Sequence, residues 1–389
     1  MLGGRIAFNG EQRVMGALLS LVVLALLSGF LSWPLPVQFF LSVGAVIPLA
    51  AFIGAATEYL ADRLGGKIGG LLNATFGNAP DLLVGYFGVQ KGLIPLVKAT
   101  IVGALISNSA LIMGLCYVAA GLLYRAPRFD AREAGHHSVL MMLTVAALVF
   151  PSVGALVLCG PGACSGPGSP ITDVSAAIAV VLLLAYIAYI LFSIFGLESL
   201  RHFYPGRDAS MIEELGEAEE TAPWPWQFSL LVLVLATAAL VPVTDILTGT
   251  VTAVTGVLHW TQVFVGIVIV ANAGNVAEGY AAVRLAVQRG GAPAGSGSGL
   301  DLSLGIASAS SIQIATFVAP VIVLYSLTTH HMSLVFSPVE LVILALLVII
   351  FAYIGHDGES NWLEGVELIA LYAMAAIVFY AFPVRVFGA

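Results

Sequence analysis

The sequence predicts an all-α, polytopic membrane protein with eleven transmembrane helices: one extra N-terminal helix followed by two inverted five-helix repeats. Its 389 residues include only 14 basic and 22 acidic side chains, while 59% are hydrophobic and the mean hydropathy is +1.01. Soluble domains are usually about 25% charged, so a water-facing globule is excluded. The net charge of −8, without a basic stripe, argues against nucleic acid as a partner. Two further observations, the apolar blocks and a repeated motif, complete the prediction.

Eleven apolar blocks are long enough to cross the hydrocarbon core, which takes about 20 helical residues. Each is continuously apolar and rich in Leu, Ala, Val and Ile, which favours helices over the short alternating strands of a β-barrel. The first block lacks a small-residue cleavage site, so we expect a retained helix rather than a signal peptide. The blocks cover residues 14–32, 36–60, 68–90, 94–123, 138–158, 174–197, 227–248, 258–286, 302–327, 334–354 and 362–383.

Basic residues divide unevenly between the two sides of the predicted membrane. With eleven spans, only Lys91, Lys98 and Arg385 fall on one side. Short basic loops tend to stay cytoplasmic, so we expect the N-terminus inside and the C-terminus outside, in the cell (inner) membrane. The residues on the inner side are Arg5, Arg13, Arg63, Lys67, Arg125, Arg128, Arg132, Arg201, Arg207, Arg284 and Arg289.

A long polar interruption from Glu198 to Trp226 separates six apolar blocks from five. We therefore predict an N-terminal helix in residues 1–33, a first repeat in 34–197, a linker in 198–226 and a second repeat in 227–389.

The two groups of blocks share a motif. Gly-Asn-Ala-Pro-Asp at 77–81 is matched by Gly-Asn-Val-Ala-Glu at 274–278, and an apolar block with small polar residues follows each. A repeat of five helices is odd, so its two copies enter the membrane from opposite faces. Inverted repeats occur in secondary transporters, with the binding site at their interface near the midplane. The motif therefore predicts a transporter rather than an enzyme.

Asp81 and Glu278 are the acids of this motif, and both lie inside apolar blocks. An ionised carboxylate at that depth is costly unless it is paired, hydrated or neutralised. The nearest basic residue in either block, Arg284, lies on another face of its helix from Glu278. The missing counter-charge must therefore come from a transported cation or from protons.

The residues around the two acids supply oxygen and lack His and Cys. Hard cations such as Ca²⁺ take six to eight oxygen ligands, whereas zinc and copper favour imidazole or thiolate. Calcium is therefore the predicted transported ion, with sodium second, and no organic cofactor is expected. The predicted ligands are Asp81 and Glu278 with Gly77, Asn78, Ser107, Asn108, Gly274, Asn275, Ser310, Ser311 and Gln313.

Two carboxylates also predict an exchange mechanism. One Ca²⁺ or two protons cancel their charge of −2, whereas the empty, doubly ionised site is costly to carry through a closed intermediate. Burial beside a like charge favours protonation of a carboxyl group. We therefore expect loaded forms to cross and the empty form not to.

The motifs resemble those of the calcium/cation antiporter superfamily, in particular its calcium/proton exchanger branch. The similarity rests on residues 69–79, 274–278, 310–315 and 360–365 and covers most of the chain. It implies the eleven-helix fold, alternating binding of Ca²⁺ and H⁺ at Asp81 and Glu278, and oxygen donation by Asn78, Asn275 and Gln313. It also implies an acidic cytosolic helix in the linker, here with Glu213, Glu214, Glu217, Glu219 and Glu220.

This sequence departs from the family pattern at three positions. Asp81 stands where the family has Glu, Gly279 where many members have His, and Ala104 where most have Ser. The shorter Asp81 side chain draws its carboxylate back by about one carbon–carbon bond. We expect this to lower the affinity or change the ion preference.

Several alternatives stay open at this point. A sodium-coupled cation exchanger is the first, and an intramembrane hydrolase with two carboxylates sharing a proton is a distant second. The acidic linker residues 213–220 can be a solvated segment or a calcium-attracting element. Cys159 and Cys164 bracket an outer loop as a disulfide or as two thiols, and the sequence leaves a homo-oligomer open.

Overall fold

The computed structural model describes residues 10–64, 72–73, 75–158, 169–195, 224–289 and 298–381, and most of these residues are helical. Eight segments are long and apolar enough to cross a membrane, and Met141–Ala155 and Pro338–Ile354 are shorter apolar helices. Between the described residues, the one β contact is an isolated bridge of Arg128 with Glu359. The prediction of an all-α polytopic membrane protein is confirmed, and the number of eleven spans stays a prediction.

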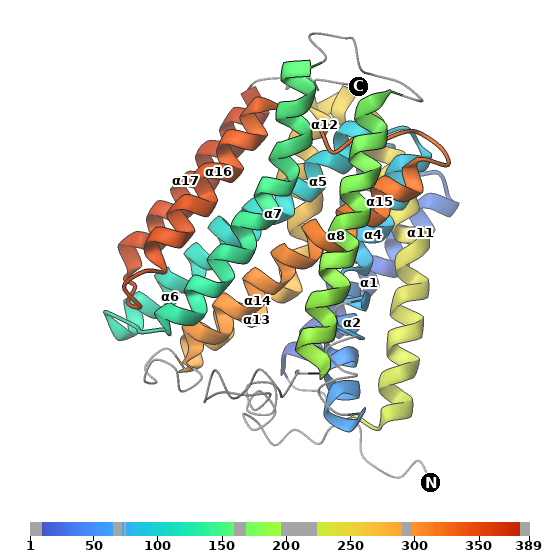
Figure 1. The fold of residues 1–389 in the computed structure, drawn as a ribbon. Coiled ribbons are helices and arrows are strands. Elements are labelled where there is room, and N and C mark those ends of the chain that lie inside the picture. Colours follow the sequence, from blue (N-terminus) through green and yellow to red (C-terminus); the bar gives the residue numbers. More distant parts are fainter. Residues whose placement is uncertain are drawn as a thin grey trace.

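Each helix overlaps a predicted apolar block, but α11 continues ten residues past the block end at 248, and α4 begins at Ala79 inside the block 68–90. Three of the segments contain a π-helical stretch (Figure 1). Those before the linker are α1 (Gly10–Phe30), α2 (Leu35–Leu64), α4 (Ala79–Gln90), α5 (Ile94–Ile106) continuing through η1 (Ser107–Ile112) into α6 (Met113–Tyr124), α7 (Ala131–Leu158) and α8 (Pro170–Phe195). Those after it are α11 (Trp226–Leu258), α12 (Gln262–Phe264) continuing through η3 (Val265–Val270) into α13 (Ala271–Arg289), α14 (Gly299–Gln313) continuing through η4 (Ile314–Val318) into α15 (Ala319–Ser326), α16 (Pro338–Ile354) and α17 (Trp362–Ala381).

The helices pack around two apolar clusters. One joins α1, α2 and α11 with parts of α4 and η3, and the other joins α5 to α8 with α13 to α17. Figure 1 shows α2 beside α11, the most extensive helix pair. Helix α4 contributes Val84 to the first cluster and Val89 to the second. The helix that carries Asp81 therefore lies between the two clusters.

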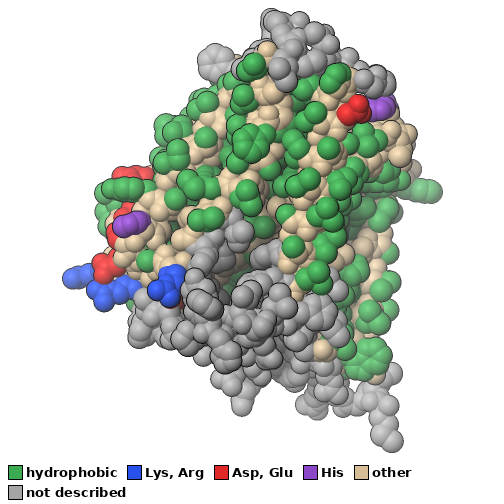
Figure 2. All heavy atoms as spheres, viewed as in Figure 1, with side chains coloured by type: hydrophobic (Ala, Val, Ile, Leu, Met, Phe, Trp, Pro, Cys, Tyr) green, Lys and Arg blue, Asp and Glu red, His purple; other side chains and the backbone are tan. Residues whose placement is uncertain are grey.

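The outer surface suits hydrocarbon. On the face shown in Figure 2, hydrophobic side chains cover the middle of the molecule, and coloured charged and histidine side chains lie toward its ends. Leu143 and Phe150 of α7 and Val181, Leu184 and Ile187 of α8 are all more than half exposed. An apolar surface of this extent marks contact with a membrane or a partner. Contact with the hydrocarbon of a lipid bilayer therefore accounts for these exposed apolar side chains.

Several helix starts are fixed by side-chain caps. Ser298 accepts from the Asp301 amide while Asp301 accepts from the Ser298 amide, and Ser337 and Glu340 form the same reciprocal box at the start of α16. Such capping boxes satisfy two backbone donors that would otherwise lack partners. They place the start of α14 three residues before the predicted block.

The segment between α15 and α16 differs from the prediction. The sequence places the tenth span at 334–354, but residues 331–337 are non-helical and α16 begins at Pro338. We call residues 327–337 the outer strap. Leu334, Val335 and Phe336 are nevertheless at most 3% exposed. Non-helical backbone is tolerated at membrane depth only where protein surrounds it.

Side chains from three helices satisfy the backbone of the outer strap. The Leu334 amide donates to Ser175 Oγ of α8 at 3.0 Å, and the Phe336 amide donates to Ser152 Oγ of α7 at 2.9 Å. From α5, Lys98 Nζ donates to the Val335 carbonyl at 2.8 Å. Lys98 is only 3% exposed. Its burial inside an apolar helix is therefore explained by the strap that it holds.

Two ion pairs join segments that are distant in sequence. Lys91 at the end of α4 forms an ion pair of 2.6 Å with Asp245 of α11, and Arg128 pairs with Glu359 at 2.7 Å. Both pairs are substantially exposed, so each contributes less than about 1 kcal/mol. The first pair holds the end of α4 beside the interior of α11, and the second holds the segment before α7 beside the segment before α17.

Some predictions fall outside the described residues. The acidic linker between residues 198 and 223 and the cysteines Cys159 and Cys164 are among them. Cys116 is described, and it is a buried free thiol.

We predict that Ser152→Ala destabilises the protein by about 1–2 kcal/mol, because it leaves the buried Phe336 amide without an acceptor. The measurement is thermal unfolding of the purified protein in detergent. Ser138→Ala is the matched control, since that buried hydroxyl of α7 bonds only to the Ala134 carbonyl of its own helix. Equal melting temperatures for the two variants would contradict the role assigned to the strap.

Candidate cation site

The turn at Gly77 and Asn78 places Asp81 at the start of a helix. Pro80 occupies the first turn of α4, where its missing amide hydrogen is tolerated. The predicted block 68–90 is therefore not one continuous helix, because residues 77–78 form a turn and α4 begins at Ala79. Asp81 lies in the same first turn. A helix N-terminus favours a negative side chain by a few tenths to about 1 kcal/mol.

Glu278 is positioned differently, in the middle of the continuous helix α13. The π-helical segment η3 immediately precedes that helix, and π-helical segments often mark functional sites. The carboxylate of Glu278 accepts a hydrogen bond from the Ser310 hydroxyl of α14. Its Oε2 atom is buried and has no hydrogen-bond partner. Glu278 therefore keeps one carboxylate oxygen for a ligand.

The two acids come from different halves of the chain and lie near each other. Asp81 interacts electrostatically with Glu278. A Cβ atom on Gly274, one turn before Glu278, would lie only 3.4 Å from Asp81 Oδ1. Both residues are only partly exposed, and the Oε2 atom of Glu278 is buried. The structure thus places the two acidic side chains near each other inside the helix bundle.

Two amide hydrogen bonds cross between the halves with the same pattern. Asn78, three residues before Asp81, donates from Nδ2 to Gln313 Oε1 at 2.7 Å. Asn275, three residues before Glu278, donates from Nδ2 to Asn108 Oδ1 at 3.2 Å. Each motif asparagine therefore binds an amide oxygen on the helix that follows the other motif.

Asn108 connects this pattern to Glu278. Its Nδ2 donates to Ser310 Oγ at 2.9 Å, and Ser310 in turn donates to the Glu278 carboxylate. Asn108 and Asn275 are at most 3% exposed, and Ser310 is 4% exposed. A buried and satisfied polar network of this kind rigidifies its members. It fixes the orientation of Glu278 relative to three helices.

A second hydrogen-bonded group lies beside the first and was not predicted. Ser107 Oγ donates to Asn272 Oδ1 at 2.6 Å, and Asn272 Nδ2 donates to Tyr372 Oη of α17 at 2.6 Å. Asn272 lies two residues before the second motif. It is a polar residue in an otherwise apolar run, and this was the feature of the sequence that could have identified it. Ser107 therefore bonds to Asn272, whereas the sequence placed it directly among the cation ligands.

Helices α5 and η3 approach closely enough to bring these groups together. A Cβ atom on Gly103 would lie 2.5 Å from the Ile267 Cα atom, and one on Gly266 would lie 2.6 Å from the Ala99 Cβ atom. Small residues at a helix crossing allow such close backbone contact in membranes. The glycine contact therefore holds Ser107 and Asn108 against the helix that leads to Glu278.

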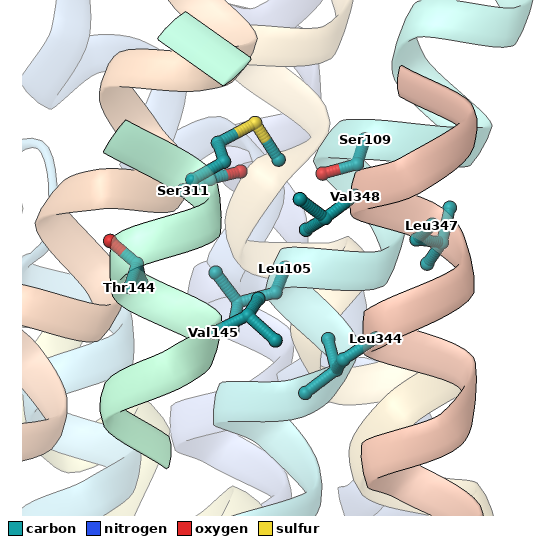
Figure 3. A pocket seen from close by; sticks show the side chains of 9 residues that line it. Leu105, Ser109, Thr144, Val145, Ser311, Leu344, Leu347 and Val348 are labelled. Atoms are coloured by element: carbon teal, nitrogen blue, oxygen red, sulfur yellow. The ribbon is translucent and has the colours of Figure 1, made fainter. Parts of the chain in front are cut away.

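The structure separates Ser311 from the other predicted ligands. Ser311 lies beside a small, mostly apolar cavity together with Ser109 and Thr144 (Figure 3). Gly77 and Gly274 are half-buried beside the acids. In the described part of the chain, no three His, Cys, Asp or Glu side chains converge. The geometry thus offers two carboxylates with amide and hydroxyl groups, a set that matches hard cations and protons.

Comparison with known proteins is consistent with this arrangement. The sequence profile described as "Sodium/calcium exchanger protein" matches residues 34–195 and 228–381. The chain belongs to the sodium/calcium exchanger family. The two matched segments lie on either side of the polar interruption from Glu198 to Trp226, and each contains one of the motif acids.

Several known proteins are similar to this chain over nearly its whole length. A Ca²⁺/H⁺ antiporter of Synechocystis is 35% identical over 386 residues, covering 97% of this chain and 99% of its own. The Ca²⁺/H⁺ antiporter ChaA of Bacillus subtilis is 34% identical, covering 92% and 96%. The solved structure of native YfkE superposes with a TM-score of 0.77 at 31% identity, covering 95% of this chain and 100% of that one.

We predict that Asn78 and Gln313 are energetically coupled across the two halves. A double-mutant cycle of Asn78→Ala and Gln313→Ala should give a coupling free energy of about 0.5–1 kcal/mol, as expected for one interhelical hydrogen bond in a membrane protein. The measurement is the free energy of unfolding in mixed micelles.

The control cycle pairs Gln313→Ala with Ser138→Ala, a hydroxyl that bonds within its own helix. It should show no coupling. A coupling for Asn78 and Gln313 as small as the control value would show that this hydrogen bond does not join the halves.

Proposed function

We propose that this chain is a Ca²⁺/H⁺ antiporter that exports calcium from the cytosol in exchange for protons. Asp81 and Glu278 bind the two ions in turn. The observation that carries the proposal is that two acidic side chains from opposite halves lie near each other, with Glu278 Oε2 buried and left without a protein partner. The names of the Synechocystis and Bacillus subtilis relatives support the choice of ions.

The charge on the pair explains why transport is an exchange. With both groups ionised the pair carries −2, which one Ca²⁺ or two protons neutralise. The uncompensated pair would be enclosed in a medium of low polarity, where like charges repel strongly and solvation is lost. The empty site therefore stays open to water until an ion binds, and only loaded forms change access.

The surrounding polar groups complete the proposed coordination. Gln313, Asn78 and Asn275 supply amide oxygens, and the backbone of Gly77 and Gly274 supplies carbonyl oxygens beside the acids. In the hydrogen-bonded pairs the Nδ2 atoms of the two asparagines donate, which directs those nitrogens away from a cation. Ser310, Asn108 and Ser107 then act mainly by positioning Glu278 and its helix. The ligand set uses oxygen alone, as calcium requires.

The proposed topology has eleven spans in two inverted five-helix repeats, 34–197 and 227–389, after an extra helix in 1–33. Two ion pairs support it, because Lys91 with Asp245 and Arg128 with Glu359 each join residues that this count places toward the same side. The crossed amide bonds support the repeat, since each motif uses the same donor position. In this topology the N-terminus is cytoplasmic, the C-terminus is outside, and the protein lies in the cell membrane.

The test is ⁴⁵Ca²⁺ uptake into proteoliposomes under an imposed gradient. We expect a proton gradient to drive uptake, and we expect nigericin in potassium medium to abolish it by collapsing that gradient. A sodium gradient should have no effect. Uptake that follows sodium and ignores protons would instead support a sodium-coupled cation exchanger.

Neutral variants test the two acids. Asp81→Asn and Glu278→Gln should each reduce proton-driven uptake to the level of empty vesicles, while Asp81→Glu should keep measurable exchange because it retains the charge. Glu367→Gln is the control, since that acid lies on an exposed face of α17. Normal uptake by both amide variants would remove Asp81 and Glu278 from the mechanism.

A further inference from the structure

Tyr372 links a helix at the edge of the bundle to the interior. It lies on α17, which Figure 1 shows at one side of the molecule, and on which Met374 and Ile377 are more than half exposed. Tyr372 itself is only 9% exposed. Its phenol oxygen accepts a hydrogen bond of 2.6 Å from Asn272 Nδ2 of α13. A helix with one apolar face toward the bilayer thus places one polar group inside the bundle.

Three hydrogen bonds hold the side-chain amide of Asn272. Its Nδ2 atom donates to Tyr372 Oη and to the Val268 carbonyl, the latter at 2.8 Å, and its Oδ1 atom accepts from Ser107 Oγ at 2.6 Å. A carbonyl oxygen can only accept a hydrogen bond, so the amide nitrogen must lie on the Val268 side. The amide oxygen is thereby directed at Ser107, and Tyr372 holds the amide from α17.

The bond between Ser107 and Asn272 is one of two neighbouring bonds between η1 and α13. The second joins the next residue of η1, Asn108, to Asn275, which lies three residues after Asn272. Asn108 also belongs to the hydrogen-bonded network that holds the Glu278 carboxylate. Because Ser107 and Asn108 are consecutive, a shift of the first moves the second. The first bond therefore helps to fix the network around Glu278.

Both ends of this first bond lie where α-helix and π-helix meet. Ser107 is the first residue of η1, and Asn272 is the second residue of α13, directly after η3. Val268, the other partner of Asn272, lies within η3, so the Asn272 side chain bridges the junction. Helices bend at π-helical segments. Contacts at these two junctions therefore influence the direction in which α13 carries Glu278.

The added bond distinguishes the two halves of the site. Asn108 and Gln313 are equivalent, since each accepts a hydrogen bond from the motif asparagine of the other half. Ser107 precedes Asn108 in the sequence. Ile312 precedes Gln313, and its side chain has no group that forms a hydrogen bond. The link to α17 is therefore a feature of the Glu278 side and does not follow from the repeated motif.

We propose that Tyr372 and Asn272 are positioning residues for calcium binding, an inference that rests on the proposed function. Tyr372 holds the Asn272 amide, and the amide holds Ser107 at the start of η1. Through Asn108, η1 then keeps Glu278 in the orientation that binds Ca²⁺. Tyr372 and Asn272 act through these contacts and are not ligands of the cation.

The first test is the Ca²⁺ affinity of the purified full-length protein in lipid nanodiscs. Tyr372→Phe keeps the ring and removes the hydrogen-bond acceptor, and we expect it to weaken Ca²⁺ binding about threefold, as for loss of one interhelical hydrogen bond in a membrane protein. Asn272→Leu removes the amide and should weaken binding at least as much. Tyr380→Phe is the matched control on α17, since Tyr380 is 56% exposed, and it should bind as the wild type does.

The second test repeats the measurement in a Ser107→Ala background, where the link between Asn272 and η1 is cut. Tyr372→Phe should there have no further effect on Ca²⁺ affinity, because its route to Glu278 is already lost. A general loss of stability would instead weaken binding to the same extent in both backgrounds. The comparison thus separates a positioning role from a merely structural one.

The outcomes also separate this inference from the proposed function. Wild-type affinity in both Tyr372→Phe and Asn272→Leu would overturn the positioning role, as would an equal effect of Tyr372→Phe with and without Ser107. A wild-type protein that binds no Ca²⁺ would contradict the proposed function and the role in calcium binding together. The same cycle, measured as free energies of unfolding, would then still decide whether Tyr372 and Ser107 are coupled through Asn272.

Discussion

The repulsion between two carboxylates inside the bilayer is the constraint on which the rest of the structure depends. Asp81 and Glu278 interact electrostatically within a bundle whose surface is apolar. Such a pair is unstable without a counter-ion. The surrounding helices therefore have to hold the carboxylates close enough to share one ligand while keeping a path to water. Asp81 and Glu278 lie near each other in the bundle, and the Oε2 atom of Glu278 has no protein partner.

The crossed amide bonds are the means by which the helices achieve this. Each motif asparagine reaches an amide oxygen of the other half, at Gln313 or Asn108, so neither acid is positioned by its own half alone. The glycine contact of Gly103 with Ile267 allows the helices to approach that closely. Lys98 also holds the non-helical backbone of residues 327–337 through its hydrogen bond to the Val335 carbonyl. The polar interior is thus built from contacts distant in sequence.

Much of this arrangement could be predicted, for physical reasons that are specific to membranes. The apolar blocks had to be helices because hydrocarbon leaves backbone groups no other partner, and the two acids stood out because charge is rare there. The start of α16 could not be predicted, because residues 334–336 are apolar and only side chains from other helices show that they form a strap.

The direction in which each side chain points from its helix was the second feature that could not be predicted from the sequence. Ser310 and Ser311 are adjacent and of the same residue type, yet only Ser310 is hydrogen-bonded to Glu278, because the two side chains point to different sides of α14. Asn272 was overlooked because its partners, Ser107 and Tyr372, lie on helices far away in sequence. The residue types near an acid in the sequence therefore indicate the chemistry of a site, but they do not show which of those residues contact the acid.

The most direct measurement is the number of protons released when purified protein binds Ca²⁺ in weakly buffered detergent solution. Metal binding displaces protons from its ligands. If one Ca²⁺ and two protons are alternative ligands of the same pair, release should approach two protons per Ca²⁺ at low pH and fall toward zero as the pH rises and both carboxylates ionise. Calcium binding without proton release at any pH would contradict the account.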